Sequence, residues 1–118
     1  MTAPFDLHTH FFGPEFYRTL AAMAHPEGDP EPGYARLLAS GIEVVRETPA
    51  AHARRWLAEM DRHGLERMVT FASLPDEVPS VADGVAAAGG RLLPFALIDP
   101  TLRNAPERAR TLVRDHGI

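Results

Sequence analysis

Polar and apolar side chains alternate at the opening of the chain. In residues 5–10 (FDLHTH), Asp6, His8 and His10 occupy every second position. A β-strand places successive side chains on opposite faces, so this pattern predicts a strand with the acid and both histidines on one face. The segment 11–14 (FFGP) follows directly and predicts the end of the strand.

Helix-like and strand-like patterns alternate along the rest of the chain. Apolar residues at helical spacing, with capping residues at the ends, predict helices over 14–24, 48–64, 80–90 and 104–117. Short apolar runs over 69–72, preceded by Arg67 and Met68, and over 92–98 are typical of buried strands. Because proline cannot donate to a strand ladder, Pro94 predicts that pairing in the last strand begins at Phe95.

Residues 25–48 interrupt this alternation. Prolines and glycines over 25–33 predict a loop, residues 34–38 favour a helix, and residues 42–45 are typical of a short strand. We interpret 25–48 as a loop-rich insertion after the first strand–helix step.

The order of these elements predicts an α/β fold with parallel strands. A complete (β/α)8 barrel needs roughly 250 residues, more than twice the length of this chain. We therefore expect residues 1–118 to form the amino-terminal portion of a TIM-type barrel, with about three βα units and an insertion after the first. The remainder of the barrel would follow Ile118. The alternative is a complete small α/β domain.

Composition narrows the class of protein. The 118 residues are 45% hydrophobic and 24% charged, which is typical of a globular chain. A net charge of −4 without a basic stripe argues against nucleic acid as a partner. The chain shows neither a long apolar run nor a signal-peptide pattern, so we expect a cytoplasmic protein without a membrane partner.

The first strand carries the candidate chemistry. Parallel α/β folds place their sites at the carboxyl ends of the strands, where His8 and His10 can bind one divalent metal ion together. Asp6 lies one step deeper and is expected to orient a ligand histidine from the second shell. Phe12 and Asp99, near the ends of two predicted strands, are candidates for the substrate side. The alternative is that the histidines are surface residues or are satisfied inside a core.

Other features of the sequence limit this interpretation. The chain has no cysteine, so nitrogen and oxygen are the only good metal ligands. His52 and His63 flank the apolar face of a predicted helix, and we expect both to be solvated.

Three segments resemble one known family. Residues 5–18 (FDLHTHFFGPEFYR), 56–65 (WLAEMDRHGL) and 94–100 (PFALIDP) are similar to the opening of the amidohydrolase-related family. The nearest likeness is to the branch that contains aminocarboxymuconate-semialdehyde decarboxylase and related aromatic-acid decarboxylases. The likeness covers most of the chain except residues 25–48, and the histidine motif is its most specific part.

The resemblance implies a partial metal-dependent hydrolase domain with a divalent ion, zinc foremost and manganese as the other option. His8 and His10 match the paired ligands of the first strand. The implied reaction is hydrolysis of a C–N, ester or lactone bond, or non-oxidative decarboxylation of an aromatic or enoic acid. The later histidines and final aspartate of the family have no counterpart here. We therefore assign no catalytic residue, and expect these 118 residues alone to be inactive.

Two other functions remain open from the sequence. Phosphoesterases of the polymerase-and-histidinol-phosphatase class also open with a His-x-His strand, and a catalytically inactive barrel half would have no enzymatic role. For the enzyme, we expect a small-molecule substrate as the partner, with a homodimer as an option.

Overall fold

Three parallel strands form the centre of the structure, a computed structural model that describes residues 3–25 and 27–118. The strands are β1 (Phe5–His10), β2 (Arg67–Ala72) and β3 (Leu92–Ala96), and they lie in this order in one sheet. The predicted positions of the first two strands and the predicted parallel pairing are confirmed.

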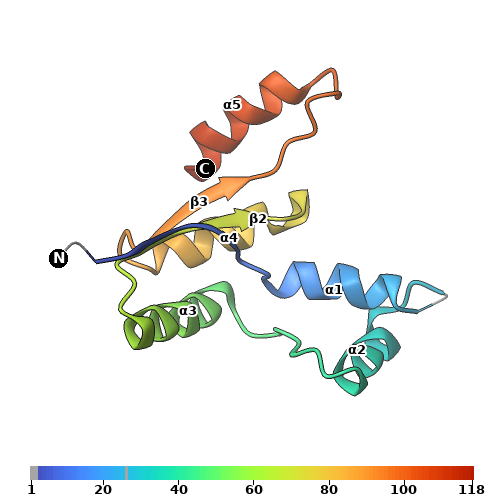
Figure 1. The fold of residues 1–118 in the computed structure, drawn as a ribbon. Coiled ribbons are helices and arrows are strands. Elements are labelled where there is room, and N and C mark those ends of the chain that lie inside the picture. The colour runs from blue at the N-terminus through green and yellow to red at the C-terminus, as the bar shows by residue number, and fades with distance from the viewer. Residues whose placement is uncertain (1–2, 26) are drawn as a thin grey trace.

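Helices surround this sheet unevenly (Figure 1). They are α1 (Pro14–Met23), α2 (Pro30–Ala39), α3 (Pro49–His63), α4 (Val78–Ala86) and α5 (Ala105–His116), with a 3-10 turn, η1 (Pro75–Glu77), before α4. Helices α3 and α4 cover one face of the sheet, whereas α1 and α2 lie to one side of it. Within the described ranges, none of the helices combines the length and apolar composition needed to cross a bilayer.

The main core lies between the sheet and the helices α3 and α4. Its buried members come from both layers: Phe11, Ala53, Met60, Met68, Ala72, Val78, Val81, Ala88 and Leu92.

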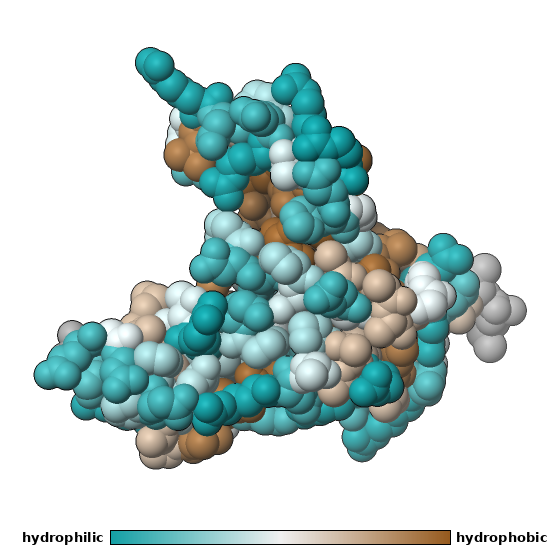
Figure 2. All heavy atoms as spheres, turned by 180° about the vertical axis from the view of Figure 1, so that it is seen from behind, coloured by the Kyte–Doolittle hydropathy of each residue, from teal (hydrophilic) through white to brown (hydrophobic). Residues whose placement is uncertain are grey.

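A groove with apolar residues lies between α5 and the rest of the domain. Figure 2 shows this apolar surface from behind, and Leu97, Ile98 and Leu112 line the groove beside η1 and α4.

The prediction of a partial (β/α)8 barrel was wrong. The described residues form a small α/β domain with an open three-stranded parallel sheet, in which β1 and β3 are the edges, and five helices. In a repeated βα unit the helix after a strand packs back on the sheet. Here α1 packs against α2 instead, in a separate apolar cluster of Ala21, Tyr34 and Leu37. The α/β class and the parallel strands are the correct parts of the prediction.

The segment 25–48 contains more helix than we expected. Residue 26 lies outside the described residues, α2 occupies 30–39, and 42–45 is irregular chain rather than a strand. Gly33 has a steric role in α2, because a Cβ at this position would lie 1.8 Å from the Ala21 carbonyl oxygen. The absence of that atom allows the two helices to pack closely.

Two predicted boundaries also differ. The helix expected to begin at Ser80 begins at Val78, after the η1 turn, and the Ser80 hydroxyl donates to the Glu15 carboxylate instead of capping the helix. Strand β3 includes Pro94, paired with Thr70, because β3 is an edge strand where one missing N–H donor is tolerated. The helix over 48–64 is confirmed with its Thr48 cap and the left-handed Gly64.

Candidate functional site

His8 and His10 lie on the same face of β1, near its carboxyl end. Their ring centroids are 5.3 Å apart, with 64° between the ring planes. Both rings pack against Phe71 of β2, with centroid distances of 4.8 Å for His8 and 5.8 Å for His10. The structure therefore brings together the two histidines that the strand pattern placed on one face.

Asp6 does not lie on the same face of β1 as the two histidine rings, because the strand pairing is irregular between Asp6 and Thr9. Asp6 pairs with Met68 and Thr9 with Thr70, so three steps along β1 match two along β2. Residues paired across a sheet point to the same face, which puts Asp6 with the core residue Met68 rather than with the histidine rings. Its Oδ1 accepts a hydrogen bond from the His8 backbone N–H at 2.9 Å. That oxygen is thus held by main chain and not by an imidazole.

Ser73, which the sequence analysis missed, holds the His10 ring. The Ser73 Oγ lies 2.7 Å from His10 Nδ1, one residue beyond the end of β2. This contact fixes the ring and leaves its Nε2 as the nitrogen for a ligand. The sequence feature that could have indicated this role is the position of Ser73 directly after the strand that pairs with β1.

Phe12 stacks on the outer side of the histidine pair. Its ring lies 5.2 Å from the His10 ring, with 11° between the planes, and 4.4 Å from the Phe16 ring. Phe12 has φ of +50°, a left-handed conformation that is uncommon for a bulky residue. Such conformations persist where the surrounding structure requires them, and here the turn carries the ring onto His10.

Asp99 lies in the turn after β3, and its carboxylate is used locally. Asp99 Oδ1 accepts hydrogen bonds from the Thr101 backbone N–H at 2.9 Å and from the Thr101 hydroxyl at 2.6 Å. These bonds lower the pKa of the Asp99 carboxyl below its usual value. The structure therefore places Asp99 as the acceptor of a turn, on the exposed surface.

Glu77 is a buried carboxylate that connects the ends of β1 and β2. Its oxygens accept backbone N–H hydrogen bonds from Gly13 at 2.9 Å, Ser73 at 2.7 Å and Leu74 at 3.2 Å. Burial raises the pKa of the Glu77 carboxyl, although these three bonds act in the opposite direction. Glu77 thereby fixes both chain segments that position His10. The signal in the sequence was a glutamate three residues after Leu74, with Pro75 at the start of a helical turn.

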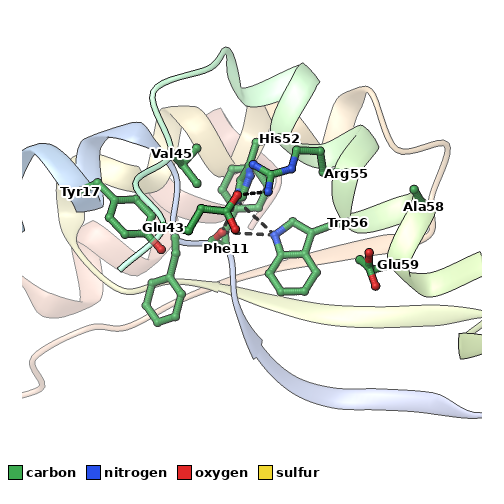
Figure 3. A pocket seen from close by; sticks show the side chains of 10 residues that line it. Phe11, Tyr17, Glu43, Val45, His52, Arg55, Trp56, Ala58 and Glu59 are labelled. Atoms are coloured by element: carbon green, nitrogen blue, oxygen red, sulfur yellow. Dashed lines mark hydrogen bonds and ion pairs between the residues drawn. The ribbon is translucent and has the colours of Figure 1, made fainter. Parts of the chain in front are cut away.

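A cavity of about 420 Å³ lies on the other side of the same chain segment (Figure 3). Its walls come from the turn after β1, from α1, from the segment before α3 and from α3 itself. The cavity is lined by Phe11, Phe12, Tyr17, Glu43, Val45, His52, Arg55, Trp56, Ala58 and Glu59.

His52 lies in the wall of this cavity, and the expectation that it is solvated was wrong. The residue is only 7% exposed, and its Nε2 donates to the Phe11 carbonyl oxygen at 2.7 Å. Trp56 Nε1 also donates to that oxygen, at 3.3 Å. His63, by contrast, has a side chain that is 66% exposed.

The spacing of the two imidazoles can be compared with that of histidines bound to one metal ion. From typical Zn–N distances, two imidazoles on one tetrahedral ion have ring centroids roughly 5 Å apart, close to the spacing of His8 and His10. Among residues 3–25 and 27–118, no three His, Asp or Glu side chains come together as a metal-binding group. The pair therefore fits part of a ligand set.

Comparisons with protein-family models, with curated proteins and with solved structures found no match to this chain.

Proposed function

We propose that this protein is a metal-dependent enzyme of the amidohydrolase type. It would act as a hydrolase on a C–N, ester or lactone bond, or as a non-oxidative decarboxylase of an aromatic or enoic acid. The observation that carries the proposal is the pair His8 and His10, on one face at the carboxyl end of a parallel strand. The resemblance of residues 5–18 to the amidohydrolase-related family supports the same conclusion.

In this proposal, His8 and His10 hold the divalent ion, zinc or manganese. Such an ion polarises a substrate carbonyl or carboxylate, which is the Lewis acidity that either reaction needs. The Ser73 hydroxyl keeps the His10 ring in one orientation. His10 Nε2 is therefore already positioned to bind the metal ion. Glu77 holds the Ser73 main chain in place.

The aromatic side chains around the pair favour a substrate with an apolar body. Phe12 stacks on His10, and Phe71 contacts both histidine rings. A planar apolar group could pack on these rings while its polar group faces the histidines. We assign no residue to proton transfer.

Metal retention tests the proposal before any substrate is known. The full chain is loaded with Zn²⁺ or Mn²⁺ and dialysed, and bound metal is measured by mass spectrometry for the wild type, His8→Ala and His10→Ala. We expect the wild type to retain metal and each variant to lose most of it, while the exposed control His63→Ala behaves as the wild type. Equal retention by wild type and both variants would refute the proposal.

Activity then distinguishes the reaction classes. The loaded protein is assayed for hydrolysis of amides, esters and lactones and for release of carbon dioxide from aromatic acids. Turnover here would overturn the expectation that these 118 residues alone are inactive. Turnover of phosphate monoesters alone, sensitive to His8→Ala, would assign the histidine pair to a phosphoesterase instead.

A further inference from the structure

The cavity beside α3 has the size and lining of a small-molecule site. Its volume of about 420 Å³ lies within the range of ligand pockets, roughly 300–1,000 Å³. Phe12, Tyr17 and Trp56 give it aromatic walls, and Val45 adds an apolar surface. Figure 3 shows the Tyr17 and Trp56 rings on either side of Glu43 and Phe11.

Carboxylates outnumber guanidinium groups around the cavity. Glu43, Glu59 and Arg55 line it, and Glu47 lies next to His52 and Arg55. Glu59 also pairs with Arg62 at 3.7 Å. Arg55 pairs with both Glu43 and Glu47, so one guanidinium is shared between two carboxylates. The pKa of the Tyr17 hydroxyl is raised, first by burial and then by the nearby Glu43 carboxylate. Arg55 has a smaller effect in the opposite direction.

His52 adds a buried ring nitrogen without a hydrogen-bond partner to the wall. Because a carbonyl oxygen can only accept, the bond to Phe11 places a proton on His52 Nε2. Within the described part of the chain, Nδ1 has no hydrogen-bond partner, and Glu47 Oε1 lies 3.5 Å from it. A second carboxylate thus lies close to the cavity wall at His52.

We propose that this cavity binds a small organic cation, an amine with an aromatic or aliphatic body. The body packs against Trp56 and Val45, and the ammonium group lies at the Glu43 carboxylate. Aromatic rings attract cations through their electron-rich faces, and carboxylates reinforce that attraction. The site involves neither His8 nor His10, and it requires no metal ion.

The fluorescence of Trp56, the single tryptophan of the chain, measures binding directly. The metal-free full chain is titrated with 2-phenylethylamine and, separately, with 3-phenylpropionate, an anion of similar size. We expect a saturable change with the amine and binding of the anion at least about tenfold weaker.

Glu43→Gln removes one charge from the cavity, and its side chain is 73% exposed, so the variant keeps the fold. We expect it to weaken amine binding roughly three- to tenfold, the effect of one partly exposed charge. The matched control, Glu66→Gln, changes an exposed glutamate away from the cavity and should leave amine binding unchanged.

Three results would overturn the proposal. They are a fluorescence titration without saturation, binding of the anion as tight as that of the amine, and equal weakening by Glu43→Gln and Glu66→Gln. His8→Ala separates this site from the proposed metal site, because it should abolish metal retention and leave amine binding intact.

Discussion

The two sides of the segment that follows β1 use histidine in opposite ways. On the sheet face, His8 and His10 lie beside Phe71, and His10 is held through one ring nitrogen by Ser73. On the helix face, His52 is buried and bonded to the Phe11 main chain. The first arrangement leaves His10 Nε2 available to a ligand, whereas the second uses the His52 ring to fix the backbone and buries its other nitrogen. A candidate ligand histidine is therefore distinguished from a structural one by what its ring nitrogens contact.

Glu77 is the link between these two sides. It accepts from Gly13, which follows the Phe11–Phe12 turn, and from Ser73, which contacts His10. Changes at Glu77 should therefore affect both sides, whereas changes at the individual histidines should affect only one.

Glu77→Ala should produce the largest loss of stability. The substitution leaves the N–H groups of Gly13, Ser73 and Leu74 without their acceptor in a buried region. Because each such group costs about 1–3 kcal/mol and release of the buried charge offsets part of this, we expect a loss of about 2–4 kcal/mol. Urea unfolding measures it. Glu66→Ala, at an exposed position, should change stability by less than about 0.5 kcal/mol, and an equal loss in both variants would contradict the role of Glu77.

The pH dependence of stability tests the same carboxylate. Burial raises the pKa of Glu77 in the folded state above its usual value, so the folded state favours the protonated form. The resulting stabilisation is fully present below the unfolded-state pKa and is lost as pH rises through the folded-state pKa. The difference in unfolding free energy between wild type and Glu77→Gln should therefore shift against the wild type as pH rises through this window. A difference that is constant with pH would contradict the raised pKa.

His52→Ala tests the helix side alone. The substitution removes a donor to the Phe11 carbonyl and leaves a space beside Trp56, so we expect a loss of about 2 kcal/mol in urea unfolding. Metal retention should stay at the wild-type level. His8→Ala should show the reverse, with metal retention lost and stability nearly unchanged. If both variants lost stability equally, the contrast between the two sides would be wrong.

Gly84→Ala should have a smaller effect on the same side. A Cβ at this position would lie 2.5 Å from Phe11 Cζ and 3.3 Å from the Pro49 carbonyl oxygen. Alanine favours a helix more than glycine does, so any loss comes from steric conflict, and we expect about 1–2 kcal/mol by thermal or urea unfolding. Asp83→Ala, an exposed neighbour in α4, is the matched control. A more stable Gly84→Ala variant would show that Phe11 moves freely.

Features encoded by neighbouring residues could be predicted from the sequence. The Thr48 cap, Pro49 and the left-handed Gly64 defined α3, and alternation along 5–10 placed His8 and His10 on one face. Each depends on residues a few positions apart, where spacing and geometry are directly related.

Features that depend on distant partners could not be predicted. The irregularity in β1 that separates Asp6 from the histidines is set by pairing with β2, about 60 residues later. His52 meets the Phe11 carbonyl across 41 positions, and Glu77 meets Gly13 across 64. The packing of α1 on α2 likewise depends on a close approach at Gly33, and this packing separates the fold from the expected barrel portion.

Ser73→Ala should have the smallest effect on stability. It tests whether the Ser73 hydroxyl, rather than ring packing, positions His10 for metal binding. The hydroxyl contacts His10 Nδ1, whereas the bond to Glu77 comes from the Ser73 backbone and survives the substitution. We therefore expect a loss of stability below about 1 kcal/mol but metal affinity lowered at least about tenfold, because the ring of a ligand histidine is no longer oriented. Zinc titration measures the affinity, with Ser40→Ala, at the end of α2, as the control. Ser73→Thr keeps the hydroxyl and should recover most of the affinity. Wild-type affinity in Ser73→Ala would mean that the His10 ring is positioned by its packing against Phe12 and Phe71 alone.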